Sequence, residues 1–227
     1  MKSVVFDVKG ALAHFRRPDT TATQLTYPFI TPLAAKGLVG AILGITDFTT
    51  QDRVGIQLLR PVSTSAQQLS MLGKDGGSSF NRPTTMELLV NPAYRLYYTG
   101  DEYVEELIKS LKNKHSVYHT YLGVAFAFTC PELIQYYEEV EIVSDEEVIE
   151  TYSIVPTNMI QELIIEEERY YSRAGGFMKD YLGERRFEKS ISFIYEKDGR
   201  SIKFQLKRDD CEGCLVAQIG DKRICLV

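Results

Sequence analysis

Residues 4–44 read VVFDVKGALAHFRRPDTTATQLTYPFITPLAAKGLVGAILG. Within them, positions 4–9 place apolar side chains at every second residue, the period of a half-buried β-strand. Thr31 is a suitable N-cap and Pro32 a suitable first-turn residue for a helix, which Gly44 is expected to end. The chain therefore opens with a strand, a polar segment and a helix.

The segments that follow complete a recognisable order of elements. Strands are predicted at 54–58 and 88–98, a helix from Asp101, and a short buried strand at 124–128. The order strand, helix, strand, strand, helix, strand is the split βαβ pattern of ferredoxin-like and RNA-recognition domains. We therefore predict an α+β fold whose first domain, residues 1–135, is ferredoxin-like (RRM-like).

Residues 61–83 form a polar stretch between the second and third predicted strands. They include Gly73, Gly76 and Gly77 and are too numerous for a tight turn. Two interpretations stay open at this point, a flexible arm that projects from the domain and a disordered surface loop.

The remainder of the chain, 136–227, contains short runs with β-like composition. Asp198-Gly199 is typical of a hairpin turn, and residues 162–171 fit either a strand or a helix. We predict a smaller β-rich domain here.

Composition limits the possible functions. The chain has 227 residues and a net charge of −5. Residues 1–100 carry 10 Lys and Arg against 6 Asp and Glu, whereas residues 101–227 carry 16 against 25. A polyanion is therefore expected to bind the first part of the chain.

The apolar stretches point to a cytoplasmic protein. The longest uninterrupted one, at 38–45, is far shorter than the ~20 residues that a spanning helix needs. Asp7 and Lys9 interrupt the apolar segment that a secretory signal would require. We expect no membrane interaction.

The opening stretch contains the residue types that bind single-stranded RNA. Arginines clamp phosphates, hydroxyls and helix N-terminal amides donate hydrogen bonds, and aromatic rings stack on unpaired bases. A solvated basic loop beside a glycine-tolerant helix is the alternative. The candidate residues are His14, Phe15, Arg16, Arg17, Thr26, Tyr27, Thr31, Lys36 and Gly37.

A second cluster lies between the second helix and the strand predicted after it. It contains Lys114, His115 and His119. Histidine can transfer protons during RNA cleavage while lysine stabilises the developing charge, so a metal-independent ribonuclease is conceivable. Histidines that hydrogen-bond RNA or cap the helix are the alternative.

Metal and cofactor sites are not expected. Cys211 and Cys214 have the spacing of half a zinc site, but structural zinc takes four ligands and no second pair occurs in the sequence. We predict neither a metal nor a cofactor.

The opening stretch also carries a family signature. Its motifs are Phe6-Asp7-Val8-Lys9-Gly10, His14-Phe15-Arg16-Arg17-Pro18, Thr26-Tyr27-Pro28-Phe29 with Thr31-Pro32, and Lys36-Gly37-Leu38-Val39-Gly40-Ala41-Ile42-Leu43-Gly44. Together they resemble the N-terminal signature of the fifth CRISPR-associated (Cas) family, which belongs to the repeat-associated mysterious protein (RAMP) superfamily. The version here is similar to the type I-B branch.

This resemblance implies a fold, a role and partners. The fold is a ferredoxin-like domain with a projecting β-hairpin thumb, expected at about 61–86 and carrying Arg82 as an RNA contact. Family members bind the 5′ handle of the CRISPR RNA (crRNA) and cap the backbone of Cascade, the type I surveillance complex of antiviral defence. The implied partners are the crRNA handle, the backbone and large subunits, and target DNA near the PAM.

The same resemblance bears on catalysis. In the type I-C branch the protein itself cuts precursor crRNA with a Tyr, Lys and His set. Lys114, His115 and the segment 121–123 are similar to that branch, but 42–44 lacks the tyrosine expected at the end of the first helix. We therefore expect a non-catalytic RNA-binding subunit, with a metal-independent endoribonuclease that processes precursor crRNA as the alternative.

Overall fold

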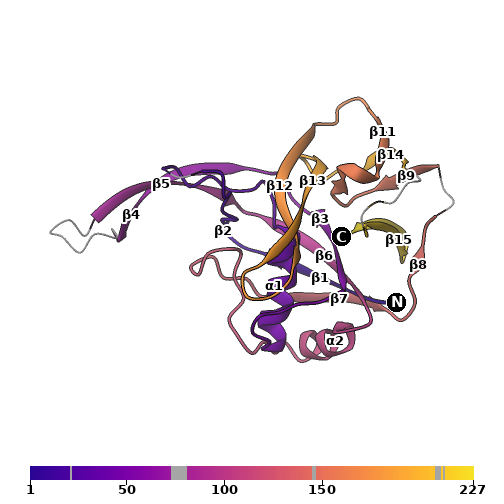
Figure 1. Ribbon diagram of the computed structural model, residues 1–227, viewed down its shortest axis with the longest axis horizontal. Helices are drawn as coiled ribbons and strands as arrows, with labels where there is room; N and C mark the ends of the chain where they lie inside the picture. Colours follow the sequence, from indigo (N-terminus) through magenta and orange to yellow (C-terminus); the bar gives the residue numbers. More distant parts are fainter. Residues whose placement is uncertain (21, 73–80, 145–146, 208–210, 212) are drawn as a thin grey trace.

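The computed structural model describes every residue except 21, 73–80, 145–146, 208–210 and 212. Four antiparallel strands form its central sheet, namely β1 (Lys2–Lys9), β3 (Arg53–Leu58), β6 (Ala93–Gly100) and β7 (Glu132–Tyr137), in the order β3-β6-β1-β7. Helix α2 (Val104–Lys112) packs on β1, β6 and β7, and α1 (Pro32–Leu43) packs beside it and on β3 (Figure 1). This arrangement confirms the mixed, strand-rich class predicted from the sequence.

Helix α1 begins and ends at the predicted residues. The Thr31 hydroxyl accepts a hydrogen bond from the Ala34 amide at 3.0 Å, which caps the first turn. Gly44 ends the helix in the left-handed region, with φ 77°. A Cβ at Gly44 would lie 2.7 Å from the Val117 side chain, so glycine is required there for space as well as for conformation.

Helix α2 is anchored by one buried carboxylate. Asp52 accepts hydrogen bonds from the backbone amides of Asp101, Glu102 and Tyr103 at 2.9 to 3.1 Å. These bonds occupy amide groups that would otherwise lack partners just before the helix. A Cβ at Gly100 would lie 1.8 Å from the Asp52 carboxylate, so the glycine makes room for this anchor.

A long hairpin projects from the body between β3 and β6. It consists of β4 (Thr64–Leu72) and β5 (Asn81–Val90), and the short strand β2 (Leu12–Ala13) pairs with its base. Figure 1 shows it extending well beyond the remaining elements, and we call it the thumb. Gly73, Gly76 and Gly77, the glycines of the predicted arm, lie outside the described residues.

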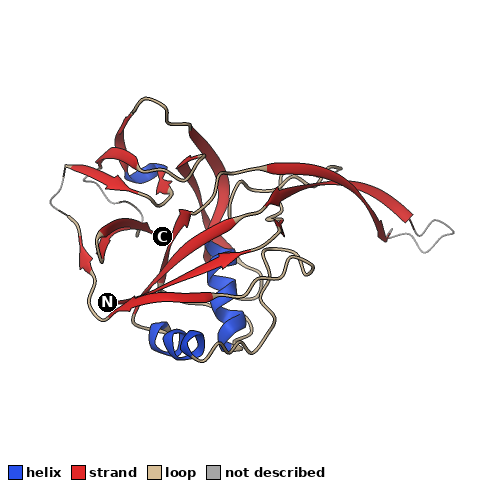
Figure 2. Cartoon of the chain, turned by 180° about the vertical axis from the view of Figure 1, so that it is seen from behind, coloured by secondary structure: helices blue, strands red, loops and turns tan. Residues whose placement is uncertain are grey.

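Short strands make up most of the C-terminal part, on the side of the body opposite the thumb (Figure 2). They form three sheets, with the orders β10-β13-β12, β11-β14-β9 and β16-β15-β8. The elements are β8 (Glu141–Ile142), β9 (Val148–Thr151), β10 (Val155–Pro156), the 3₁₀ turn η1 (Thr157–Met159), β11 (Ile160–Ile164), β12 (Tyr171–Tyr181), β13 (Phe187–Glu196), β14 (Ile202–Leu206), β15 (Leu215–Ile219) and β16 (Lys222–Leu226).

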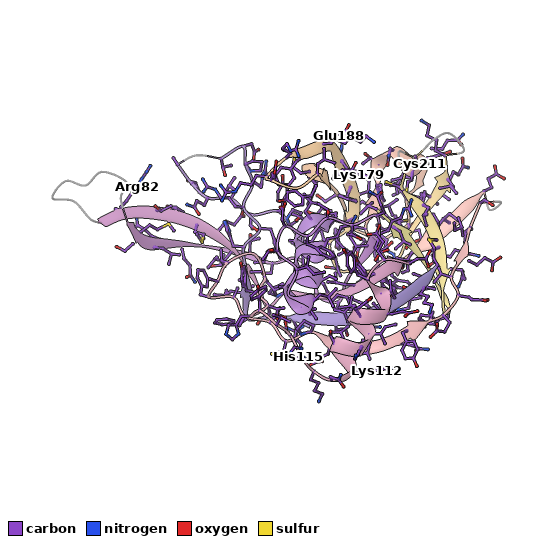
Figure 3. The ribbon with its side chains drawn as sticks, turned by 60° about the horizontal axis from the view of Figure 1, so that its bottom comes forward. Arg82, Lys112, His115, Lys179, Glu188 and Cys211 are labelled. Atoms are coloured by element: carbon purple, nitrogen blue, oxygen red, sulfur yellow. The ribbon has the colours of Figure 1, made fainter. Side chains whose placement is uncertain are left out.

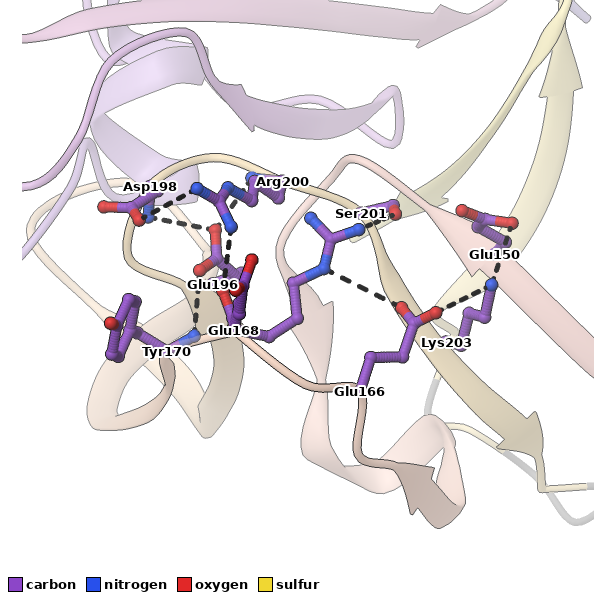
Figure 4. A network of polar contacts seen from close by, with 10 residues as sticks. Glu150, Glu166, Glu168, Tyr170, Glu196, Asp198, Arg200, Ser201 and Lys203 are labelled. Carbon is purple, nitrogen blue, oxygen red and sulfur yellow. Dashed lines mark hydrogen bonds and ion pairs between the residues drawn. The ribbon is translucent and has the colours of Figure 1, made fainter.

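Asp198-Gly199 forms a turn but not the predicted hairpin. The flanking strands β13 and β14 enter different sheets. Buried Glu196 accepts hydrogen bonds from the amides of Tyr170, Asp198 and Arg200 at 2.8 to 3.0 Å, which directs the chain out of β13 (Figure 4). The carboxylate thus replaces the cross-strand bonds of a hairpin.

Aromatic rings join the C-terminal part to the N-terminal part. Phe177 of β12 stacks on Tyr27 and Phe29, with centroid distances of 4.2 and 5.2 Å, and meets Phe193 of β13 edge-on at 5.1 Å. These rings belong to one hydrophobic core that also contains β1 and α1 side chains. The domain boundary predicted near residue 135 falls within β7 and stays a prediction.

Two predicted strands differ from the structure. Residues 124–128 form a turn-rich loop, and the fourth strand of the sheet is β7. The single strand predicted over 88–98 is divided between β5 and β6, because Asn91 adopts a positive φ of 49° and turns the chain. In the described part of the chain, no helix is long and apolar enough to cross a membrane.

Candidate nucleic-acid interface

Residues 114–128, which we call the aromatic loop, follow helix α2 and display large side chains to solvent. Four aromatic residues are about half exposed or more: Tyr118 at 49%, Tyr121 at 45%, Phe126 at 54% and Phe128 at 62%. Exposed rings of this size are costly to leave in water and are typical of binding surfaces. Bases of a single strand stack on such rings.

The backbone of the aromatic loop is held firmly against the body. The amides of Val117 and Tyr118 donate to the carbonyls of Ile42 and Ala41 at the end of α1, at 3.1 and 3.0 Å. Leu122 and Ala127 are buried and share a backbone hydrogen bond of 2.8 Å. These two apolar side chains point into the core, and the aromatic residues next to them in the chain, Tyr121, Phe126 and Phe128, are exposed to solvent.

The aromatic loop lies alongside the basic segment of the opening stretch. The His14 amide donates to the Leu122 carbonyl at 3.1 Å. A Cβ at Gly123, which has φ 84°, would lie 1.9 Å from the His14 carbonyl oxygen. The same Cβ would lie 3.0 Å from the Phe15 ring, so the loop lies directly beside His14 and Phe15, which precede Arg16 and Arg17 in the chain.

The two arginines of this segment differ in availability. Arg17 makes a bidentate ion pair with Asp19, at 2.6 and 3.1 Å, which raises the pKa of Arg17 and lowers that of Asp19. Arg16 is exposed and makes no ion pair with any described residue. Arg16 is therefore the more available cation for a phosphate.

Lys114, His115 and His119 are also exposed on the aromatic loop. The His119 ring meets the edge of Phe128 at 5.8 Å. Arg82 is exposed on the thumb, and Figure 3 shows it far from His115, which lies on the underside of the body. Arg82 therefore lies away from the aromatic loop, whereas Arg16 is two residues beyond His14, whose backbone contacts that loop.

Four predicted RNA-binding residues are buried, which corrects their assignment. Phe15 and Tyr27 are 4% and 7% exposed, and His14 and Thr26 are also buried. The Tyr27 ring stacks on Phe177, and its hydroxyl donates to the Gly176 carbonyl at 2.6 Å. Rings packed in this way are not accessible to bases.

These buried residues instead hold the opening segment in place through hydrogen bonds. His14 Nδ1 donates to the Glu87 carbonyl at 2.7 Å, which ties the segment to β5 of the thumb. Burial lowers the pKa of His14, so the ring is neutral near pH 7. The Thr26 hydroxyl accepts from the Phe15 amide at 2.9 Å and holds the same segment.

The last three predicted residues belong to α1. Thr31 caps the helix, whereas Lys36 and Gly37 line a separate groove of about 930 Å³. The groove lies between α1, the segment 45–53 and the ends of β12 and β13. The predicted set is therefore divided between two surfaces.

Sequence reasoning missed Phe126 and Phe128 as surface residues. The short apolar run 124–128 predicts a buried strand, although Gly123 is a turn signal immediately before it. Sequence reasoning also missed the cations that the second half of the chain contributes to the groove, among them Lys179. The composition of that half does not show where these cations lie in the fold.

Three of the four cysteines, Cys211, Cys214 and Cys225, lie in the C-terminal part, and Cys130 is exposed just before β7. Cys214 and Cys225 are buried, and burial raises the pKa of Cys225 to about 12. Among the residues that the structure describes, no group of three His, Cys, Asp or Glu is arranged to hold a metal ion.

The chain matches one protein-family model over residues 3–209, that of the CRISPR-associated protein family Cas_Cas5. None of the curated proteins compared with the chain matches it. Similar solved structures include a CRISPR protein from Archaeoglobus fulgidus, with 10% identity, TM-score 0.58 and coverage of 99% of this chain and 98% of that one.

Two further structures belong to larger assemblies. A chain of a CRISPR RNA-guided surveillance complex has 11% identity and TM-score 0.55, over 89% of this chain and 90% of that one. A chain of the type III-B Cmr-beta complex bound to cognate target RNA and AMPPnP has 11% identity and TM-score 0.52, over 88% and 86%. At these identities the similarity is one of fold.

Proposed function

The chain belongs to the CRISPR-associated Cas5 family, and on this premise we propose that it is a subunit of a type I Cascade complex that binds the 5′ handle of the crRNA. The aromatic loop and Arg16 carry the binding. The observation that supports this most is the exposure of Tyr118, Tyr121, Phe126 and Phe128 on a loop that is hydrogen-bonded to His14, two residues before the exposed Arg16. The similarity of fold to a chain of an RNA-guided surveillance complex agrees with it.

The proposal includes the ferredoxin-like arrangement of the N-terminal part. Its support is the sheet order β3-β6-β1-β7, with α1 between β1 and β3 in the chain and α2 between β6 and β7. That order is the split βαβ pattern. A rigid sheet then carries the aromatic loop at one end and the thumb at another.

Each part of the surface has a defined task in this proposal. The exposed rings stack on unpaired bases, each contributing about 1–3 kcal/mol. Arg16 and Lys114 bind phosphates, and His115 and His119 hydrogen-bond the strand. The thumb, with Arg82, extends toward the backbone subunits of Cascade.

We propose that Lys114 and His115 contact the RNA without cleaving it. The reason is the sequence at 42–44, which lacks a tyrosine where the cleaving relatives are expected to have one. Precursor RNA incubated with the protein in chelator is expected to remain intact. Cleavage that Lys114→Ala abolishes would assign the chain to the endoribonucleases instead.

Arg16→Ala is expected to weaken binding of handle RNA and to reduce its salt dependence. Removing one cation that neutralises a phosphate of a single strand lowers the slope of log K against log salt by about 0.7. The measurement is fluorescence anisotropy of labelled RNA carrying the 5′ handle, over a range of salt concentrations. Lys207→Ala, which removes one exposed cation of the C-terminal part, is the matched control and is expected to leave the slope unchanged.

Equal slopes for the Arg16→Ala and Lys207→Ala variants would contradict the assignment of Arg16. Binding of handle RNA no tighter than binding of an unrelated RNA of the same length would contradict the proposed function itself.

A further inference from the structure

The groove that contains Lys36 and Gly37 is separate from the aromatic loop. It encloses about 930 Å³, a volume within the usual range of ligand sites. Figure 3 shows Lys179 and Glu188, two of its lining residues, together on the side of the body away from His115. The proposed function assigns no ligand to this groove.

Positive side chains from three distant parts of the chain converge here. Helix α1 contributes one, β3 another, and the ends of β12 and β13 the rest, although residues 101–227 are acidic as a whole. Asp47 is occupied by the Tyr181 hydroxyl and the Glu184 amide, and Asp180 lies 4.0 Å from Lys189. The cations are Lys36, Arg53, Lys179, Arg185 and Lys189.

Lys36 is partly buried and has no direct anionic contact among the described residues, although the charges of Asp180 and Asp52 act on it from beyond ion-pair distance. It makes no hydrogen bond or ion pair with any residue that the structure describes, and burial lowers its pKa. An ammonium group that is partly withdrawn from water without a hydrogen-bonded partner is less favourable than one in open solvent. A phosphate in the groove would remove this cost.

Gly40 and Gly37, both in α1, differ in whether neighbouring atoms leave room for a side chain. A Cβ at Gly40 would lie 2.7 Å from Phe48, so packing requires that glycine. A Cβ at Gly37 would meet no described atom within 4 Å, yet glycine inside a helix costs about 1 kcal/mol relative to alanine. Packing therefore does not explain Gly37, whereas close approach of a ligand to the helix does.

The opposite wall offers an aromatic surface. Phe187 is 49% exposed, and its ring lies 5.2 Å from that of Tyr181 at an angle of 41°. Leu182, also exposed, adds apolar area beside it. A planar base can lie against this wall.

We propose that the groove holds one nucleotide of the guide RNA, with its phosphate at Lys36 and its base against Phe187. This inference rests on the proposed function and adds a second RNA-binding surface to it. The mixed lining favours a nucleotide over an acidic peptide, because a base offers N–H donors to the Glu188 carboxylate while its phosphate meets the cations. A peptide of Asp and Glu residues would present no planar ring to the wall that contains Phe187.

The test compares three variants of the full chain by anisotropy with RNA carrying the 5′ handle. The groove variant is Lys36→Ala with Phe187→Ala, the loop variant is Tyr121→Ala with Phe128→Ala, and the control is Lys207→Ala with Tyr170→Ala. The groove variant is expected to bind at least about tenfold more weakly than the control, because it can neither stack on the base nor neutralise the phosphate. Its ribonuclease footprint is expected to lose protection at one nucleotide only.

A second groove variant guards against misfolding. Gly37→Leu adds a side chain at a position where a Cβ meets no described atom within 4 Å, so it is expected to melt no lower than the unmodified protein and still to weaken RNA binding. Gly37→Ala is expected to stabilise the helix.

Each of the other outcomes overturns either the nucleotide-binding role of the groove or the proposed binding of handle RNA. Unchanged affinity of the groove variant with weakened binding by the loop variant overturns the groove and leaves the function standing. Unchanged RNA affinity with loss of a partner subunit in pull-down makes the groove a peptide site and overturns the inference. Tight binding of a free nucleoside monophosphate without any effect on RNA affinity also overturns it, and unchanged affinity of both variants overturns the proposed function.

Discussion

Replacing Tyr121 and Phe128 together with alanine is expected to weaken binding of handle RNA by about thirtyfold or more. A base stacked on an aromatic ring contributes about 1–3 kcal/mol, and about 1.4 kcal/mol corresponds to a factor of ten. Both residues are exposed and neither belongs to the buried core, so their truncation leaves no cavity in the core. The weaker affinity therefore measures binding, because folding is unaffected.

The measurement is anisotropy at one fixed salt concentration, with thermal unfolding of each variant as the check on folding. Tyr170→Ala is the matched control, since Tyr170 is 61% exposed in the C-terminal part and belongs to neither surface. A double variant that binds within about threefold of the unmodified protein would show that the rings do not stack on bases.

Phe177→Ala is expected to lower the free energy of unfolding by about 3–5 kcal/mol, as for other buried phenylalanines. The ring is fully buried and touches Tyr27, Phe29 and Phe193. Its removal leaves a cavity where the C-terminal strands meet the N-terminal part.

Denaturant unfolding followed by circular dichroism measures this destabilisation. Phe177→Leu keeps most of the volume and is expected to lose less than half as much stability, and Phe126→Ala, at an exposed ring, is expected to change stability by less than about 0.5 kcal/mol. A destabilisation below about 1 kcal/mol in Phe177→Ala would mean that the stacked rings do not hold the two parts together.

The local signals of the sequence predict helix α1 well. Thr31, Pro32 and Gly44 act within one or two turns of the helix, through a side-chain cap, a preset φ and a left-handed residue. Such interactions depend on neighbours in the chain and need no tertiary contact. Strands β1 and β3 also form where predicted, although each is buried on both faces over most of its length and β1 is therefore not the half-buried strand that alternation predicts.

Prediction is wrong where distant segments decide the outcome. The apolar run at 124–128 predicts a short buried strand, but the edge of the sheet is taken by β7, and the loop packs Leu122 and Ala127 inward. Phe15 and Tyr27 are residue types that stack on bases beside Arg16, yet β6 and β12 supply Tyr94 and Phe177 to cover them. Nothing local distinguishes an exposed ring from a covered one.

The positions of the cations in the groove also could not be predicted from the sequence. Proximity in the sequence predicts that Lys36 shares a surface with Arg16. In the fold, α1 turns Lys36 toward Lys179 and Arg185, which the acidic composition of the second half conceals. Net charge along a sequence therefore does not locate a cationic surface that several elements build.

Photocrosslinking of the complex purified from its host tests the central claim most directly. The claim is that the aromatic loop contacts unpaired bases of the guide. Ultraviolet irradiation followed by mass spectrometry is expected to find guide nucleotides attached to peptides that contain Tyr118, Tyr121, Phe126 or Phe128. Crosslinks confined to the short strands β8, β9 and β14–β16, with none in residues 114–128, would contradict it.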